Sequence, residues 1–442
     1  MEPWTVERVV ALAPDSASEV AGRRLAIPAP WREVGWAEPL LWGACQGSGK
    51  TPYQVAIDTS GPRYQCSCPS RKFPCKHVLG LLFLWAEGRV YPGGGISEYA
   101  AAWAERSQAR EAPDRREPKV QTPAQLQAAS ARAAQRDARV HAGMGELERW
   151  LRDQVTTGLA AAAAGGYRGA EAMSTRMVDA QAPGVAGRLL AASRIPFGGP
   201  GWPERLLEEL GLLHLLASAE GRADLPDPLR ATVRSRLGFS VSREDVLASP
   251  PLTDRWAVVG MRDSDDEQVA TRRVWLHGLA TGVAALVLLF APPGQSFDGS
   301  LVPGIVVDAD LHFYPGQPRL RALLGERRAN TSAAGWTPPQ VRVSEVRAAW
   351  RDALALDPWL TGLPVLVTGC LWRWSTGAAG SAGERWLITD TAGEHLPVTG
   401  SQDDLWQVLA LTGGHPTTIF GEVGNAALRP TSLFLDGRLM PL

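Results

Sequence analysis

The 442-residue sequence has little of what marks several common protein classes. Its cysteines number only five, an odd count, and three of them fall within ten positions, which argues against a secreted disulfide framework. The most apolar stretch, residues 282–291, is about half as long as a membrane span. Acidic and basic residues leave a net charge of −1, so any attraction to nucleic acid or an anionic membrane must come from a local patch.

The first residues also lack the features of a secretion signal. Glu2 and Glu7 stand where a signal peptide has basic residues, and no long apolar run follows them. We therefore expect a cytoplasmic protein that does not bind membranes.

The chain is too long for one hydrophobic core, and its composition changes along its length. We expect an α+β, multidomain protein. Residues 1–95 form a compact N-terminal ββα unit, and residues 96–142, poor in bulky apolar residues, form a linker that is exposed or partly helical. Residues 143–249 have helical periodicity, and residues 250–442 have the alternation of a β-rich barrel or sandwich with one helix near residues 343–356.

A cluster of potential metal ligands lies in the first unit: Cys66 and Cys68, then six residues, then Cys75 and His77. Residues i and i+2 of a strand point the same way, so the first two thiolates can face one ion. Cys75 falls at the start of an apolar helix, where the positive helix end lowers a thiol pKa. Three thiolates and one imidazole complete a tetrahedral shell without an open position, which is typical of a structural zinc site.

Small buried hydrophobes and a core histidine are the alternative interpretation of these four residues. The basic residues that surround them make a dry core a poor fit, and they are also possible nucleic-acid contacts: Arg63, Arg71, Lys72 and Lys76.

The pattern C-x-C, gap, C-x-H over about residues 39–86 resembles the SWIM zinc finger, which implies a small ββα fold. The segments 41–43, 46–53 and 69–74 look like those of a bacterial group of full-length SWIM proteins of unknown activity. That resemblance implies a SWIM-type zinc finger domain at residues 1–95. It also implies that the protein is encoded beside MoxR-type AAA+ ATPases and von Willebrand A proteins. In the wider family, the finger is expected to contact DNA or protein.

Other motifs have simpler structural interpretations. Residues 47–51, Gly-Ser-Gly-Lys-Thr, resemble part of a P-loop, but Ala44 replaces a required glycine and a strand-like run follows, so we expect a hairpin turn. Asp308, Asp310 and His312 alternate on one strand and could hold a second metal, although the solvated face of a strand is the favoured interpretation.

Buried positions are expected for several remaining residues. Cys45, Cys370 and His214 are predicted to be buried, and Trp372 and Trp374, two apart on a strand, are predicted to be core aromatics instead of a ligand platform.

No arrangement of nucleophile and base has supporting local sequence, and no small-molecule substrate is indicated, so we expect a protein that is not an enzyme. The hypothesis is a zinc-binding recognition or adaptor module for a protein partner, with nucleic acid as the alternative ligand. The near-neutral charge and the apolar helix favour the protein.

Overall fold

The computed structural model describes most of the chain. Outside the described part lie residues 1–3, 11, 14–15, 48, 50, 60–62, 69, 71–73, 94, 112–121, 161–166, 266–269, 292–296, 298–299, 333–335, 375–384 and 426.

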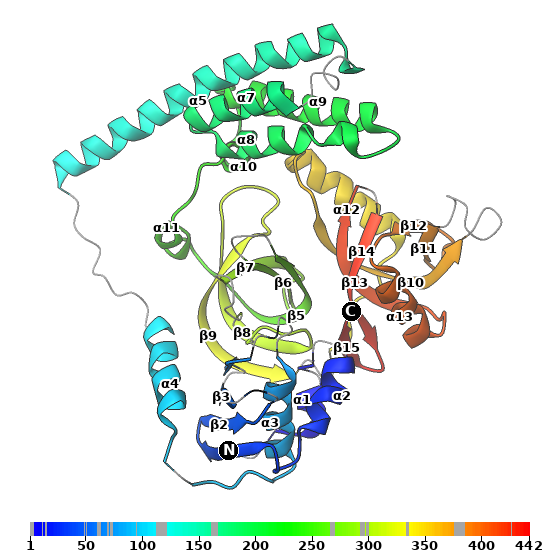
Figure 1. The fold of residues 1–442 in the computed structure, drawn as a ribbon. Coiled ribbons are helices and arrows are strands. Elements are labelled where there is room, and N and C mark those ends of the chain that lie inside the picture. Colours follow the sequence, from blue (N-terminus) through cyan, green and yellow to red (C-terminus); the bar gives the residue numbers. More distant parts are fainter. Residues whose placement is uncertain are drawn as a thin grey trace.

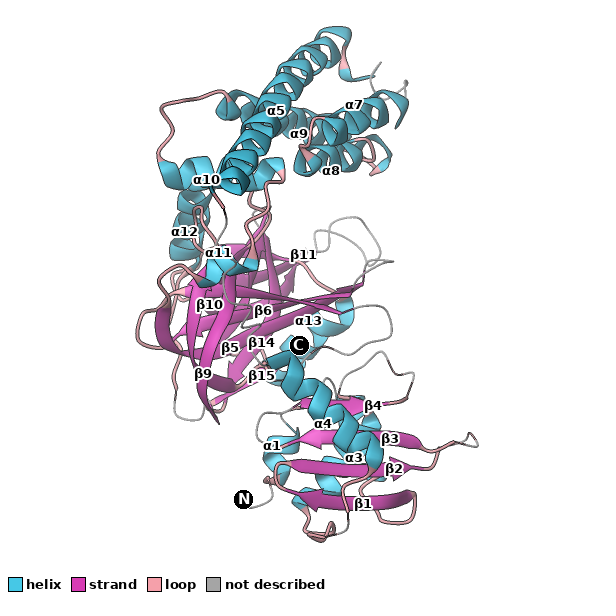
Figure 2. Ribbon diagram, turned by 90° about the vertical axis from the view of Figure 1, so that its left-hand side faces the viewer, coloured by secondary structure: helices cyan, strands magenta, loops and turns pink. Residues whose placement is uncertain are grey.

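The N-terminal unit is a four-stranded antiparallel sheet in the order β1-β2-β3-β4, with helices on one face (Figures 1 and 2). The apolar helix α3 is buried along nearly its whole length because α1 and α2 cover the side that faces away from the sheet. The elements are α1 (Val6–Val10), α2 (Ser16–Arg24), β1 (Trp31–Ala37), β2 (Leu40–Cys45), β3 (Tyr53–Asp58), β4 (Arg63–Cys66) and α3 (Lys76–Ala86).

Helix α4 (Glu98–Glu111) covers the opposite face of this sheet. Tyr99, Ala100 and Trp103 pack there against Trp42 and Ala56. The N-terminal unit thus has three layers and extends beyond the predicted boundary at residue 95, because the few apolar residues of the predicted linker lie on one side of α4.

A helical bundle follows. It consists of α5 (Pro123–Thr157), α7 (Tyr167–Asp179), α8 (Pro183–Ala192), the 3₁₀ turn η1 (Ile195–Phe197), α9 (Trp202–Glu220) and α10 (Asp227–Leu237). A capping box at Thr122 starts α5, which then runs through the predicted boundary at 142/143 without a break. The buried side chains of α5 begin at Val140, so its first half projects from the bundle (Figure 1). His214, predicted to be buried, is exposed on α9, so that prediction was wrong.

The β-rich end contains two sheets. After α11 (Arg243–Leu247), the first has the order β7-β6-β5-β8-β9, and it curls until Leu286 of β7 forms a parallel bridge with Arg321, just before β9. Its core includes Trp256, Leu276 and Val307. We call this sheet the first barrel; its strands are β5 (Leu252–Asp265), β6 (Ala270–Gly278), β7 (Ala284–Ala291), β8 (Ile305–Phe313) and β9 (Ala322–Ser332).

The second sheet, here the second barrel, has the order β12-β11-β10-β13-β14-β15, and Val398 of β12 pairs in parallel with Leu428 of β14, which nearly closes it. Helix α12 (Val343–Leu356) packs on its core. The remaining elements are β10 (Leu363–Trp374), β11 (Arg385–Thr389), β12 (His395–Val398), α13 (Gln402–Thr412), β13 (Thr417–Gly424), β14 (Ala427–Leu435) and β15 (Arg438–Pro441). The predicted α+β class, the helical middle and the barrel-like end are confirmed.

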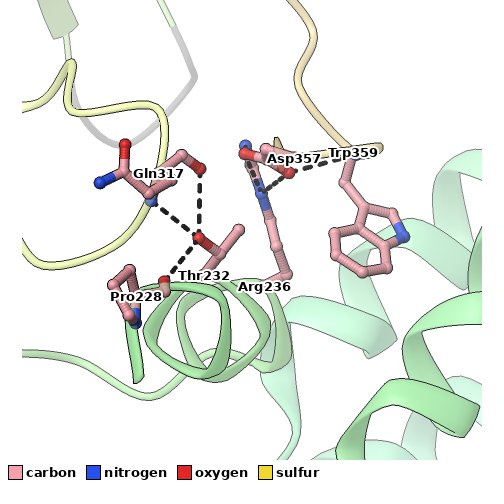
Figure 3. Close-up of polar contacts among 6 residues, drawn as sticks. All are labelled: Pro228, Thr232, Arg236, Gln317, Asp357 and Trp359. Atoms are coloured by element: carbon pink, nitrogen blue, oxygen red, sulfur yellow. Dashed lines mark hydrogen bonds and ion pairs between the residues drawn. The ribbon is translucent and has the colours of Figure 1, made fainter. Parts of the chain in front are cut away.

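Loops of both barrels hold the helical bundle (Figure 3). The Thr232 hydroxyl of α10 accepts a hydrogen bond from the Gln317 backbone N–H (2.9 Å), and Arg236 forms an ion pair with the buried Asp357. Two residues later Trp359 enters the core of the bundle, where its Nε1 donates to the Leu212 carbonyl (2.8 Å). The bundle therefore does not complete its core with its own residues.

Candidate metal centre

Local structure brings the four predicted ligands together. Cys66 is the last residue of β4, and Cys68 follows two positions later. Cys75 is the N-cap residue of α3 in extended conformation, and His77 lies in the first turn of that helix. Because α3 packs against β3 and β4, the start of the helix is held beside the end of the strand.

The geometry of this cluster fits one zinc ion. The Cys66 Sγ lies 3.8 Å from His77 Nδ1, the Cys75 Sγ lies 4.0 Å from the same nitrogen, and the four ligand atoms all lie within 4.8 Å of one another. A tetrahedral zinc ion at ordinary bond lengths separates its ligand atoms by about 3.5 to 3.8 Å. Cys75 and His77 are buried and Cys66 and Cys68 are half-buried, so the set is closed.

The thiols perturb one another strongly. Hydrogen bonding to Cys68 and Cys75, and then burial, raise the pKa of the Cys66 thiol. Hydrogen bonds with Cys66 and Cys75 lower the pKa of Cys68. The hydrogen bond with Cys66 lowers the pKa of Cys75, but the one with Cys68 and burial outweigh it and raise that pKa to about 11. Three thiolates this close repel one another unless a cation lies among them.

The predicted effect of the helix end at Cys75 is present but is not the largest one. The Val78 backbone N–H contributes a hydrogen bond that lowers the Cys75 pKa, as expected for the first turn of a helix. The neighbouring sulfur atoms and burial outweigh it. The helix end therefore makes only a minor contribution to thiolate formation at Cys75.

Tyr53 supports the cluster from β3. Its ring lies against the His77 imidazole with 4.7 Å between ring centroids. A side chain at Gly47 would clash with the same tyrosine ring, so the turn before β3 passes closely over it. Tyr53 was not predicted to belong to the site. It begins the strand-like run that follows residues 47–51, and in the structure it lies opposite Cys45 of β2.

The glycine-rich segment 47–51 joins β2 to β3 in an antiparallel hairpin. A strand follows it instead of the helix that a P-loop requires, so the hairpin prediction is confirmed. Cys45, at the end of β2, is buried as predicted, whereas Cys370 is half-buried.

The acidic residues of β8 have partners of their own. Arg328 lies 3.3 Å from Asp308 and 2.8 Å from Asp310, and His312 Nδ1 bonds to the Ser249 carbonyl (2.7 Å). Within the described part of the chain, the only grouped metal donors are the four of the N-terminal unit. The solvated face predicted for β8 is therefore the better interpretation.

The four basic residues near the cluster are described unequally. Lys76 is exposed beside the zinc ligands. Arg63 belongs to β4, but its side chain lies outside the described part, as do Arg71 and Lys72 entirely. Trp372, predicted to be in the core, lies on the outer face of the second barrel, and the side chain of Trp374 is not among those described.

The fold and the ligand set define a zinc finger protein with a closed Cys₃His site. Comparison with protein families agrees: the SWIM zinc finger matches residues 53–85, and the SWIM-associated four-helix bundle domain matches residues 135–237. The chain thus contains a SWIM zinc finger and a SWIM-associated four-helix bundle, and the predicted resemblance is confirmed. Comparisons with curated proteins and with solved structures give no significant match. Among the described helices, none is both long and apolar enough to span a membrane.

Proposed function

We propose that this protein is a non-enzymatic adaptor whose zinc-stabilised finger recognises a protein partner. The closed Cys₃His set carries the proposal, because its four protein ligands leave no coordination position for a substrate or an activated water. Zinc at this position ties the end of β4 to the start of α3 and shapes the surface around them.

The charge of the finger supports a protein over a nucleic acid. Residues 1–95 contain ten basic and eight acidic residues, which is a small excess for a module that would bind phosphates. The apolar helix expected to favour a protein partner over nucleic acid is α3, and it is buried in the core. The surface available to a partner is therefore the exposed rim of the zinc site and the edge strand β4.

The partner class follows from the resemblance to bacterial full-length SWIM proteins. A MoxR-type AAA+ ATPase that works with a von Willebrand A protein is the partner we propose. The alternative is nucleic-acid binding through Arg63, Arg71, Lys72 and Lys76, and the exposed position of Lys76 beside the ligands is the observation that keeps it open.

Binding to the purified MoxR-type ATPase from the same cell tests the proposal. The wild type should bind the ATPase, and Cys75→Ser, which breaks the ligand set, should abolish binding. Cys370→Ser is the matched control, because Cys370 lies in the second barrel outside the cluster.

A gel-shift titration at about 150 mM salt tests the alternative, because non-specific nucleic-acid binding sits at a Kd of about 10⁻⁴ to 10⁻⁶ M. Submicromolar binding that Lys76→Glu abolishes, together with no ATPase binding, would replace the protein partner by nucleic acid.

A further inference from the structure

The two barrels of the β-rich end share one strand order. Counted along the chain within each barrel, the strands lie in the order third, second, first, fourth, fifth, and the third meets the fifth in parallel. In the second barrel a helix, α13, connects the third strand to the fourth. A five-stranded, partly open barrel with these connections has the topology of an OB fold. The sequence contains no visible internal repeat, so the likeness of the two barrels is found only in their strand order.

OB folds bind extended ligands on the outer face of their second and third strands. In the first barrel this face is covered. Trp275 of β6 and Leu286 of β7 pack with Phe420 of the second barrel, and Arg273 of β6 pairs with Glu422 (2.9 Å). The first barrel therefore uses its ligand face to hold the second.

The corresponding face of the second barrel, on β10, β11 and β12, is open in the described part of the structure. Arg385, His395 and Pro397 are exposed there, while the alternate residues Trp386 and Leu396 point into the barrel core. The second barrel packs on the first through β13 and the first half of β10, at Phe420 and Leu366.

Three residues from three adjacent strands form a preorganised platform on this open face. The Trp372 indole N–H donates to the Thr389 hydroxyl, and that hydroxyl bonds to His395 Nδ1 (2.8 Å). The Trp372 and His395 rings lie edge to face with centroids 5.8 Å apart. These contacts fix both rings before any ligand arrives, which removes part of the entropic cost of binding.

Charges of both signs surround the platform. Arg385 lies on the same face of β11 as Thr389 and forms no ion pair with a described acidic side chain. Arg347 of α12, in contrast, pairs with Glu394 and donates to the His395 carbonyl. Asp390 points away, to the N-terminus of α12. Acidic residues of α13 follow β12, so the attraction to phosphate is modest and stacking must supply most of the affinity.

We propose that the outer face of β10–β12, with Trp372, Arg385 and His395, binds single-stranded nucleic acid. Bases stack on the Trp372–His395 pair, and Arg385 contacts a phosphate or stacks on a base. This site is separate from the zinc finger and does not depend on the partner proposed for it.

Fluorescence anisotropy of the zinc-loaded full chain with labelled oligo(dT) and oligo(U) of about 15 nucleotides tests this site. Trp372→Ala and His395→Ala should each weaken binding about 5- to 150-fold, the loss expected for one stacked base. Trp372→Phe should keep most of the affinity because it keeps a ring. The salt dependence should be shallow, with a log–log slope of about −0.7 for each phosphate contacted.

Matched controls lie elsewhere on the second barrel. Arg385→Glu should weaken binding, whereas Arg438→Glu on β15, at the opposite edge of the sheet, and His415→Ala after α13 should not. Absence of binding up to about 100 µM would overturn the proposal. Equal losses in target and control variants would do so too, as would binding to a neutral oligosaccharide instead of an oligonucleotide. Loss in Lys76→Glu with none in Trp372→Ala would move the binding to the finger and refute this site.

Discussion

Trp359 offers the sharpest test of how the bundle and the barrels depend on each other. It lies between α12 and β10, far along the chain from the bundle, yet only 4% of it is exposed and it packs in the core of the bundle (Figure 3). Truncation of a buried tryptophan to alanine costs about 3 to 5 kcal/mol. The loss of the indole donor to the Leu212 carbonyl accounts for about 1 kcal/mol of this cost. We expect Trp359→Ala to destabilise the bundle by about 4 kcal/mol.

Native-state hydrogen exchange is the suitable assay, because a protein with several cores need not unfold in one step. Amides of α9 and α10 should exchange faster in Trp359→Ala, because the free energy needed to open the bundle falls by about 4 kcal/mol. Trp406→Ala is the matched control: this tryptophan is 46% exposed on α13 and contacts Trp386 and Arg373 of the second barrel, so the bundle should not respond. A loss in the bundle below about 1 kcal/mol would show that the bundle completes its core without the barrel loop.

Three further results are expected. Elemental analysis should give about one zinc per chain, and Cys68→Ser should remove the zinc and the exchange protection of residues 39–90, while the second barrel stays protected. The pKa of Asp390 is lowered mainly by the Val343 backbone N–H, so its stabilising effect is present above its ordinary pKa and is lost as pH falls through the lowered value. The difference in melting temperature between wild type and Asp390→Asn should therefore shrink in acid; a constant difference would exclude the charge as its cause. Limited protease should cut first between Arg106 and Arg139, and protection throughout that stretch would contradict an exposed connection.

The zinc site was predictable from sequence because its information is local. The spacing of Cys66, Cys68, Cys75 and His77 fits one strand end and one helix start, and no distant residue is needed to assemble it. The same holds for the hairpin at residues 47–51 and for the amphipathic helix at 343–356, which the structure places at Val343–Leu356. Local patterns determine elements of this kind.

What the sequence did not reveal depends on long-range contacts. The predicted boundary at residue 95 leaves α4 outside the N-terminal unit. A short run of alanines with two aromatic residues has the composition of a linker, and only the packing of α4 on the sheet shows that it belongs to the unit. Trp372 was assigned to the core because alternation tells which residues share a face but not which face is inside. The barrel topology was hidden for a related reason: strand order follows from pairing, which leaves no periodic trace along the chain.

The connection between the third and fourth strands has different uses in the two barrels. In the second barrel it contains α13. In the first, two consecutive residues of this connection point in opposite directions: Leu301 packs in the core of the first barrel, and Val302, 5% exposed, packs in the core of the zinc finger unit. The core of the finger thus includes a barrel residue, and we expect loss of the zinc to loosen the attachment of the barrel. If Cys68→Ser leaves the exchange of residues 301–305 unchanged, Val302 holds its position without the finger and this coupling is wrong.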